Sequence, residues 1–229
     1  MTIVIICGAT FQASIGYGFG LVVVPFLLLL NPALVPVPLL VASVFLMAYV
    51  SFKNRFSLSG HSVKPLLIGL LFGAPLGALI LTFIDSTLFI YSVSVVVLLG
   101  LILSGLNISI KVSKISQFAS GLLANIIGTS TGLGGVAIAL LYQNESGKRI
   151  RAVLSTAFLI GSLFSLVALY FTSNITSTSI ILGLYLQPGV VLGSLLGARL
   201  AVYIDQGYSR IAILLLSILS VLALILKTL

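Results

Sequence analysis

Long apolar runs dominate the chain and are separated by short polar stretches. A membrane-spanning helix needs about 20 consecutive apolar residues. Six segments meet this requirement, and we expect each to form one spanning helix: about 37–52, 65–84, 87–106, 152–172, 179–203 and 208–226. Two more apolar segments, 2–30 and 115–142, are interrupted near their middle. The pattern predicts an all-α polytopic membrane protein with two broken helical segments.

Glycine clusters cause both interruptions. The first break reads GYGFG (16–20), and the second reads GTSTGLGG (128–135). Each half of a broken segment has about a dozen residues, roughly 18 Å if helical, which is about half of a bilayer core. Non-helical backbone at membrane depth is tolerated only where protein buries it or where it lines a cavity. We therefore expect the breaks to mark a functional site.

The two breaks occupy matching places in an internal repeat. The stretches GAPLGALILTFID (73–85) and GSLLGARLAVYID (193–205) share their glycines and their terminal Ile-Asp at one offset of 120 residues. Gly16 and Gly18 match Gly132 and Gly134 at an offset of 116. The chain is therefore expected to contain two membrane repeats, 1–108 and 109–229, integrated into one transmembrane domain. Each repeat is a broken segment followed by three spanning helices.

The cations predict the orientation of the repeats. Basic residues fall in or beside loops 53–64, 107–114 and 143–151, and Arg210 marks a fourth loop. Cytoplasmic loops of membrane proteins carry an excess of Lys and Arg. Loops 107–114 and 143–151 flank the second broken segment, so this segment is expected to enter from the cytoplasm and return. The first broken segment would then re-enter from outside, and the repeats would be inverted. Eight plain crossings in parallel repeats are the alternative, and they would place GKRIR outside.

Composition narrows the class of protein. Of 229 residues, 60% are hydrophobic and 6% are charged, and the mean hydropathy is +1.33. A soluble domain carries about 25% charged residues. The net charge of +8 is then attributed to Lys and Arg residues that face the cytoplasm and its anionic lipids, and not to a nucleic-acid site. The single His lies in a basic loop and acids are absent from the apolar cores, so we expect neither an enzyme nor a cofactor nor a metal site.

A broken helix can bind an anion without a charged side chain. The first N–H groups of its second half are unpaired, and the helix dipole adds positive potential there. Two breaks that meet near the bilayer centre would aim two such helix ends at one small volume. Glycine suits these turns because it accepts a positive φ and lets a ligand approach the backbone closely.

Neutral hydroxyl and amide groups near the breaks complete the predicted anion site. Serine and threonine in membrane helices often bond back to their own helix, and this is the competing interpretation for those residues. Arg199 interrupts an apolar run, where it either reaches back to the cytoplasmic surface or contacts the anion in a vestibule. The candidate substrate-binding residues are Gln12, Ser14, Gly16, Tyr17, Gly18, Gly20, Asn125, Gly128, Thr129, Ser130, Thr131, Gly132, Gly134, Gly135 and Arg199.

These motifs resemble one known family. GATFQASIGYGFGLVVVPFLLL, GTSTGLGGVAIALLY with GKRIRAVLSTAFLIG, and the later LGARL are similar to the TauE/SafE family of sulfite-exporter-like anion permeases. The resemblance covers nearly the whole chain. It implies transport of sulfite, sulfonates or related small organic anions across the cytoplasmic membrane. The family commonly has proline after the paired glycines of the second motif, whereas Val136 stands there in this chain.

We therefore expect a multi-pass secondary transporter of small anions, most simply an exporter. No acid lies near a midplane, so a coupled proton would travel on the substrate, or the membrane potential would drive export. An anion-selective channel with re-entrant half-helices is the alternative. The expected partners are the anion and the bilayer, without nucleic acid. The sequence leaves open homo-oligomer formation, the identity of the anion and the direction of transport.

Overall fold

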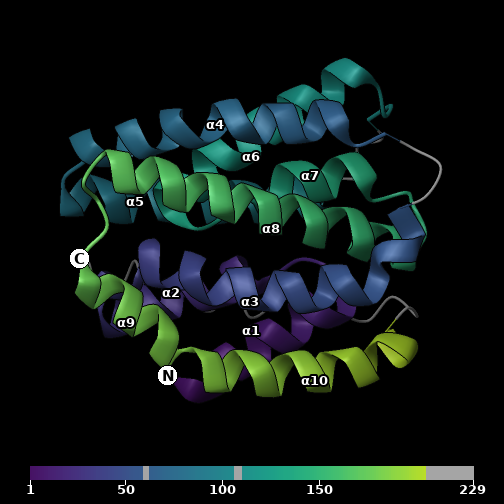
Figure 1. Ribbon diagram of the computed structural model, residues 1–229, viewed down its shortest axis with the longest axis horizontal. Coiled ribbons are helices and arrows are strands. Elements are labelled where there is room, and N and C mark those ends of the chain that lie inside the picture. Colours follow the sequence, from purple (N-terminus) through teal and green to yellow (C-terminus); the bar gives the residue numbers. More distant parts are fainter. Residues whose placement is uncertain (59–61, 106–109, 205–229) are drawn as a thin grey trace.

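The computed structural model describes residues 1–58, 62–105 and 110–204, and the described part of the chain is helical (Figure 1). Spanning segment 208–226 and Arg210, both singled out in the sequence, lie outside the described residues. The helices in chain order are α1 (Thr2–Ile15), α2 (Phe19–Leu30), η1 (Pro32–Leu34), α3 (Val37–Asn54), η2 (Arg55–Leu58), α4 (Lys64–Phe83), α5 (Ser86–Gly105), α6 (Lys114–Thr131), α7 (Gly135–Tyr142), α8 (Gly147–Phe171), α9 (Ser177–Tyr185) and α10 (Gln187–Ile204).

Both predicted breaks are present, and the chain reverses at each. Helix α1 ends at Gly16 (φ 103°), and α2 begins after Gly18 (φ 113°), so both glycines adopt the left-handed conformation. Helix α2 folds back beside α1. The two helices are in close contact, since a methyl group added to Gly8 of α1 would meet the side chains of Val23 and Phe19 on α2. The first broken segment is therefore a helical hairpin.

The second broken segment is also a hairpin. Helix α6 ends at Gly132 (φ 79°), and α7 begins after Gly134. The amide of Gln117, near the start of α6, donates a hydrogen bond to the hydroxyl of Tyr142, at the end of α7, over 3.0 Å. The two ends of this segment therefore lie together at one end of the molecule.

Each hairpin packs closely, through glycines, against a helix from the other half of the sequence. Methyl groups on Gly193 and Gly197 of α10 would collide with the carbonyl oxygens of Ile6 and Thr10 on α1. Methyl groups on Gly73 and Gly77 of α4 would collide with the carbonyl oxygens of Leu122 and Ile126 on α6. The backbones touch at these points, so these glycines allow close packing of the helices. The paired helices are α1 with α10 and α6 with α4.

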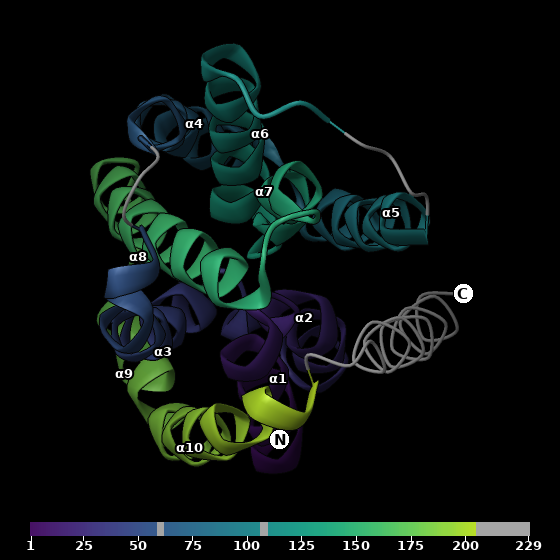
Figure 2. The ribbon, with the colours of Figure 1, turned by 90° about the vertical axis from the view of Figure 1, so that its right-hand side faces the viewer.

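The helices gather into two groups, which the end-on view separates clearly (Figure 2). One group contains α1, α2, α3, α9 and α10, and the other contains α4 to α8. The first group surrounds a core that includes Val23, Leu27 and Leu46. The second group surrounds a core that includes Leu70, Ile138 and Leu154.

Three of the predicted spans, about 37–52, 65–84 and 152–172, are confirmed, whereas segment 87–106 contributes only a shorter apolar helix, Thr87–Gly100, within the described residues. Among the described residues, α4, α8 and the continuous segment formed by η1, α3 and η2 are each long and apolar enough to cross a membrane, and α9 with α10 makes a fourth if the bent pair is one span. The prediction of an unbroken helix over 179–203 is wrong, because α9 and α10 meet at a bend of 40°. Pro188 explains the interruption: it has no N–H to donate to Leu184, and its ring clashes with that carbonyl.

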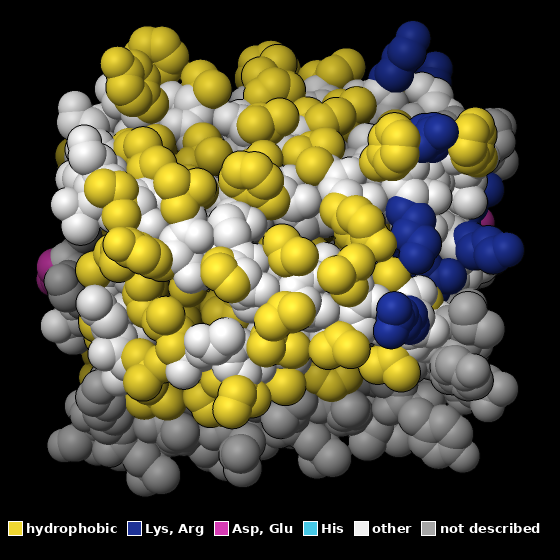
Figure 3. All heavy atoms as spheres, turned by 60° about the horizontal axis from the view of Figure 1, so that its bottom comes forward, with side chains coloured by type: hydrophobic (Ala, Val, Ile, Leu, Met, Phe, Trp, Pro, Cys, Tyr) yellow, Lys and Arg dark blue, Asp and Glu magenta, His cyan; other side chains and the backbone are white. Residues whose placement is uncertain are grey.

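The surface separates by charge along the long axis (Figure 3). Lys and Arg side chains gather toward one end, where α3 ends and where α4, α6 and α8 begin. Large apolar side chains cover much of the remaining visible surface. Over the described residues as a whole, the exposed large apolar side chains include Phe72, Phe83, Leu99 and Leu192. Such a belt is suited to contact with lipid, because the surface of a soluble monomer rarely exposes contiguous apolar patches of this extent.

Candidate functional site

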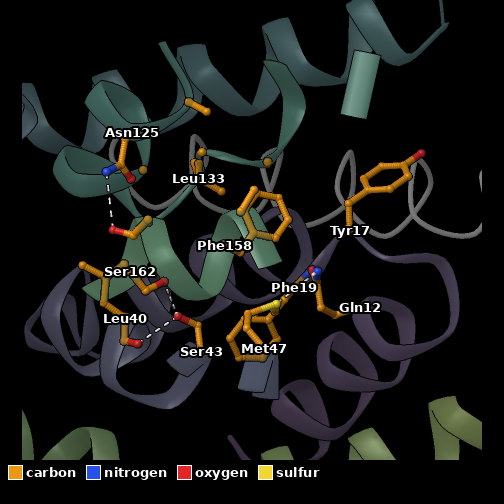
Figure 4. A pocket seen from close by; sticks show the side chains of 18 of the residues that line it. Gln12, Tyr17, Phe19, Leu40, Ser43, Met47, Asn125, Leu133, Phe158 and Ser162 are labelled. Carbon is orange, nitrogen blue, oxygen red and sulfur yellow. Dashed lines mark hydrogen bonds between the residues drawn. The ribbon is translucent and has the colours of Figure 1, made fainter. Parts of the chain in front are cut away.

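The two breaks meet at one cavity of about 80 Å³ between the helix groups (Figure 4). They approach so closely that a methyl group on Gly20 would lie 2.7 Å from the carbonyl oxygen of Gly132. Helices α3 and α8 supply the remaining walls, with α4 contributing Leu70. A cavity of this size holds several waters or one small ion, since a single water needs about 10–15 Å³.

Nine of the fifteen candidate residues line this cavity. They come from both breaks and from the helix ends beside them: Gln12, Tyr17, Gly18, Gly20, Asn125, Gly128, Gly132, Gly134 and Gly135. The structure therefore brings together two motifs that are more than 100 residues apart in the sequence.

The other six candidates are not among the residues that line the cavity. Ser14, Ser130 and Thr131 donate to carbonyl oxygens of their own helices, those of Thr10 (2.7 Å), Ile126 (2.9 Å) and Ile127 (2.7 Å). The hydroxyls of Ser130 and Thr131 thus bond within α6, where an acceptor one turn back is always within reach, and not at the cavity.

Thr129, Gly16 and Arg199 lie apart from the cavity for different reasons. The hydroxyl of Thr129 is buried against that of Ser165, at 2.6 Å. Gly16 forms the turn itself and packs against α8. Arg199 is exposed on α10, which packs against α1, and it is not part of the cavity lining.

The side chain of Gln12 ties the first break together. Its Oε1 accepts the backbone N–H of Phe19 (3.2 Å), the first residue of α2. Its Nε2 donates to the carbonyl of Gly16 (2.6 Å) and to the sulfur of Met47 (3.6 Å). Gln12 is 2% exposed, so these bonds form out of contact with solvent, where each is worth most. Gln12 fixes the path of the chain from α1 to α2.

Asn125 does the corresponding work near the second break. Its amide nitrogen donates to the carbonyls of Leu70 (2.7 Å) on α4 and Gly161 (3.4 Å) on α8. Its Oδ1 accepts from Ser165 (3.2 Å), which is also bonded to Thr129. The network joins three helices around the C-terminal half of α6 and leaves the Asn125 side chain well satisfied.

The starts of two helices contribute backbone to the cavity lining. The N-terminal residues of α2 (Gly18 to Leu21) and of α7 (Gly134 and Gly135) belong to its lining. Neither N-cap glycine offers a side chain to the first turn of its helix. Helix N-termini leave N–H groups unpaired within the helix and carry positive potential. The arrangement can therefore hold negative charge with backbone alone.

Sequence reasoning missed a serine pair on the opposite wall. The hydroxyls of Ser43 on α3 and Ser162 on α8 lie 3.0 Å apart, and Ser43 also donates to the carbonyl of Leu40 (2.8 Å). Met47 and Phe158 form an apolar wall beside them, and the ring of Tyr17 points away from this group (Figure 4). A signal existed in the sequence, because Ala-Ser-Val-Phe at 42–45 parallels Gly-Ser-Leu-Phe at 161–164.

Within the described residues, no three His, Cys, Asp or Glu side chains are grouped so that they could hold a metal ion. None of the described residues that line the cavity is charged. The chemistry that the cavity offers is therefore binding through N–H and hydroxyl dipoles.

Comparison with known proteins identifies the family of this chain. The model of the family described as Sulfite exporter TauE/SafE matches residues 1–224. Curated proteins and solved structures gave no match. The chain therefore belongs to the TauE/SafE sulfite exporter family, whose members are multi-pass membrane transporters and not enzymes.

Proposed function

We propose that the protein is a secondary transporter that exports small anions across the cytoplasmic membrane and binds them in the cavity between the two breaks. One observation carries the proposal: the N-termini of α2 and α7, from opposite halves of the sequence, line the same cavity. Sulfite, organosulfonates and related small organic anions are the substrates that the family relationship favours. The nine lining candidates, together with Ser43 and Ser162, would form the binding site.

The charge of the site favours a monovalent anion. Each helix N-terminus acts as about half of a positive charge, so two of them together match about one negative charge. A dianion would leave a charge uncompensated at low dielectric, because no described lining residue is cationic. The apolar wall of Met47 and Phe158 would accept a small organic group. We therefore expect monoanions to compete for transport at least about tenfold better than dianions of similar size.

Two inverted repeats, 1–108 and 109–229, would explain how the breaks come to face each other. The glycines of α10 and α4 are matched at an offset of 120 residues, and the carbonyls that they contact on α1 and α6 are matched at 116. Each hairpin therefore packs on the second spanning segment of the other repeat, α10 for α1 and α4 for α6, in the same register. This exchanged packing supports an approximate two-fold relation, which is the arrangement used for alternating access in many carriers.

The charged end of the molecule supports the orientation. With the basic end in the cytoplasm, the α6–α7 hairpin re-enters from the cytoplasm, and the α1–α2 hairpin re-enters from outside. Export of a monoanion would then follow a membrane potential that is negative inside, with about 2.3 kcal/mol available per 100 mV.

Flux into proteoliposomes tests the proposal. Labelled sulfite would be supplied under an imposed potential, with unlabelled sulfonates, carboxylates and dianions as competitors. A carrier predicts saturable flux, counterflow and competition by monoanions. High unitary conductance without saturation would favour the anion channel, and the absence of any anion-dependent flux in folded protein would refute transport.

A further inference from the structure

Arg151 is a cation in an unusual place. Arg151 is 6% exposed. Every other Lys or Arg among the described residues is half-buried or exposed. It lies in the first turns of α8, which begins at Gly147. The stretch GKRIR (147–151) is therefore helical, and the expectation of a loop reaching to residue 151 is wrong. Burial of a charge is costly unless the charge is paired and hydrogen-bonded, so its contacts need a reason.

The guanidinium of Arg151 contacts the broken end of α1. Its Nη1 donates to the carbonyl oxygen of Ser14 over 2.9 Å. Ser14 is in the last turn of α1, where carbonyls have no partner further along the helix and the dipole is negative. The contact is therefore a charged C-cap, supplied by a helix from the other group.

The backbone of Arg151 also supports the turn that follows. A methyl group on Gly16 would lie 3.0 Å from the Cα of Arg151 and 3.3 Å from its Cγ. The matching glycine of the second break, Gly132, instead faces apolar side chains, with Leu39 nearest at 3.0 Å. The first break is therefore held from inside by Gln12 and from outside by Arg151.

We propose that Arg151 is a positioning residue for the cavity: by capping α1 at Ser14 and bracing Gly16, it holds the first break so that the N-terminus of α2 faces the bound anion. The proposal rests on the proposed function for the identity of the ligand, and it does not require Arg151 to touch the anion. It assigns the residue to the first break only.

Hydrogen exchange measured by mass spectrometry tests the positioning directly, without a transport assay. The comparison uses wild type, Arg151→Gln, Arg151→Lys and the control Lys148→Gln, which removes an exposed charge from the same helix end. We expect amides of residues 14–21 to exchange about tenfold faster in Arg151→Gln, which corresponds to the loss of one charge-assisted bond. Arg151→Lys should be intermediate, and exchange at 130–136 should stay unchanged.

Labelled-sulfite uptake then connects positioning to function. Arg151→Gln should raise the KM about tenfold relative to wild type, while Lys148→Gln leaves it unchanged. A purely structural role would lower the amount of folded protein and leave the KM of the remainder alone. If Arg151→Gln does not fold, Arg151→Lys carries the same two measurements.

The outcomes separate the two proposals. Unchanged exchange at the first break, or an equal rise at both breaks, overturns the role of Arg151. Faster exchange at the first break together with an unchanged KM also overturns it. Absence of sulfite flux in the wild type contradicts the proposed function instead, and the exchange data still decide whether Arg151 fixes the break.

Discussion

The two breaks reach one cavity, but they are held in place by different means. The first has two left-handed glycines, Gly16 and Gly18, and polar side chains that clamp it: Gln12 from within and Arg151 from α8. The second has one left-handed glycine, Gly132, and depends on close backbone contact, because Gly134 lies directly against Ala124 and Gly128. The two repeats thus place their helix ends alike, while the contacts that hold those ends in place differ between the repeats.

The largest effect is expected from added volume at the second break. Gly134→Ala would drive a methyl group into the carbonyl oxygen of Ala124, which is backbone and cannot move aside. We predict a loss of sulfite uptake of about a hundredfold or more, as expected when a site is displaced by about 1 Å. Membrane insertion, measured by fractionation, should be normal.

Gly135→Ala is the matched control for that variant. Its methyl group would meet the ring of Phe158 at 3.2 Å, and this side chain can shift by a few tenths of an ångström. Equal losses in the two variants would mean that general crowding, and not the backbone contact at Gly134, inactivates the protein.

A smaller effect is expected from loss of the polar clamp at the first break. Gln12→Leu leaves the N–H of Phe19 and the carbonyl of Gly16 without their buried partner. Each such loss costs about 1–3 kcal/mol, so we predict a rise of at least about tenfold in the KM for sulfite. Ser14→Ala, which removes only a bond within α1, should leave the KM near that of wild type. A KM for Gln12→Leu equal to that of Ser14→Ala would contradict the clamp.

Asn125→Leu should affect stability more than binding. The amide joins α6 to α4 and α8, and its removal strands the carbonyl of Leu70. We expect a loss of about 1–3 kcal/mol in unfolding free energy, seen as a lower midpoint of thermal unfolding in detergent. An unchanged midpoint would show that the network is not a support of the second break.

The smallest effect is expected at the serine pair, which belongs to neither break. Ser162→Ala removes one neutral hydroxyl from the cavity wall while Ser43 keeps its bond to Leu40. One neutral hydrogen bond is worth about 0.5–1.5 kcal/mol, so the KM should rise about three- to tenfold. Ser92→Ala, on the exposed face of α5, serves as the control. No difference between these variants would remove the pair from the binding site.

The sequence predicted much of this arrangement because glycine in an apolar run usually marks either a break in the helix or a close contact between helices. The positions of both breaks follow from the need to satisfy non-helical backbone at membrane depth. Tertiary partners were harder to predict. Hydropathy alone does not distinguish Ser130, which bonds back to its own helix, from Ser162, which lines the cavity; only the parallel between 42–45 and 161–164 marks Ser162.

Arg151 and the bend before Gln187 show two further limits. A cation at the edge of an apolar run looks like a loop residue until the helix that carries it is known to begin at Gly147. The bend between α9 and α10 depends on Pro188, which the hydropathy pattern conceals because the stretches 180–186 and 190–192 on either side are apolar. For Arg151, the decisive contact is with α1, a helix distant in sequence. For Pro188, it is with the carbonyl one turn before it.

The central claim is that both breaks form one anion site, and equilibrium binding of labelled sulfite to purified protein tests it most directly. Wild type, Gly18→Leu and Gly134→Leu would be compared in detergent, with folding verified by circular dichroism. We predict one bound anion per chain in the wild type and none in either variant, although each variant alters only one break. Undiminished binding in both variants would contradict the account.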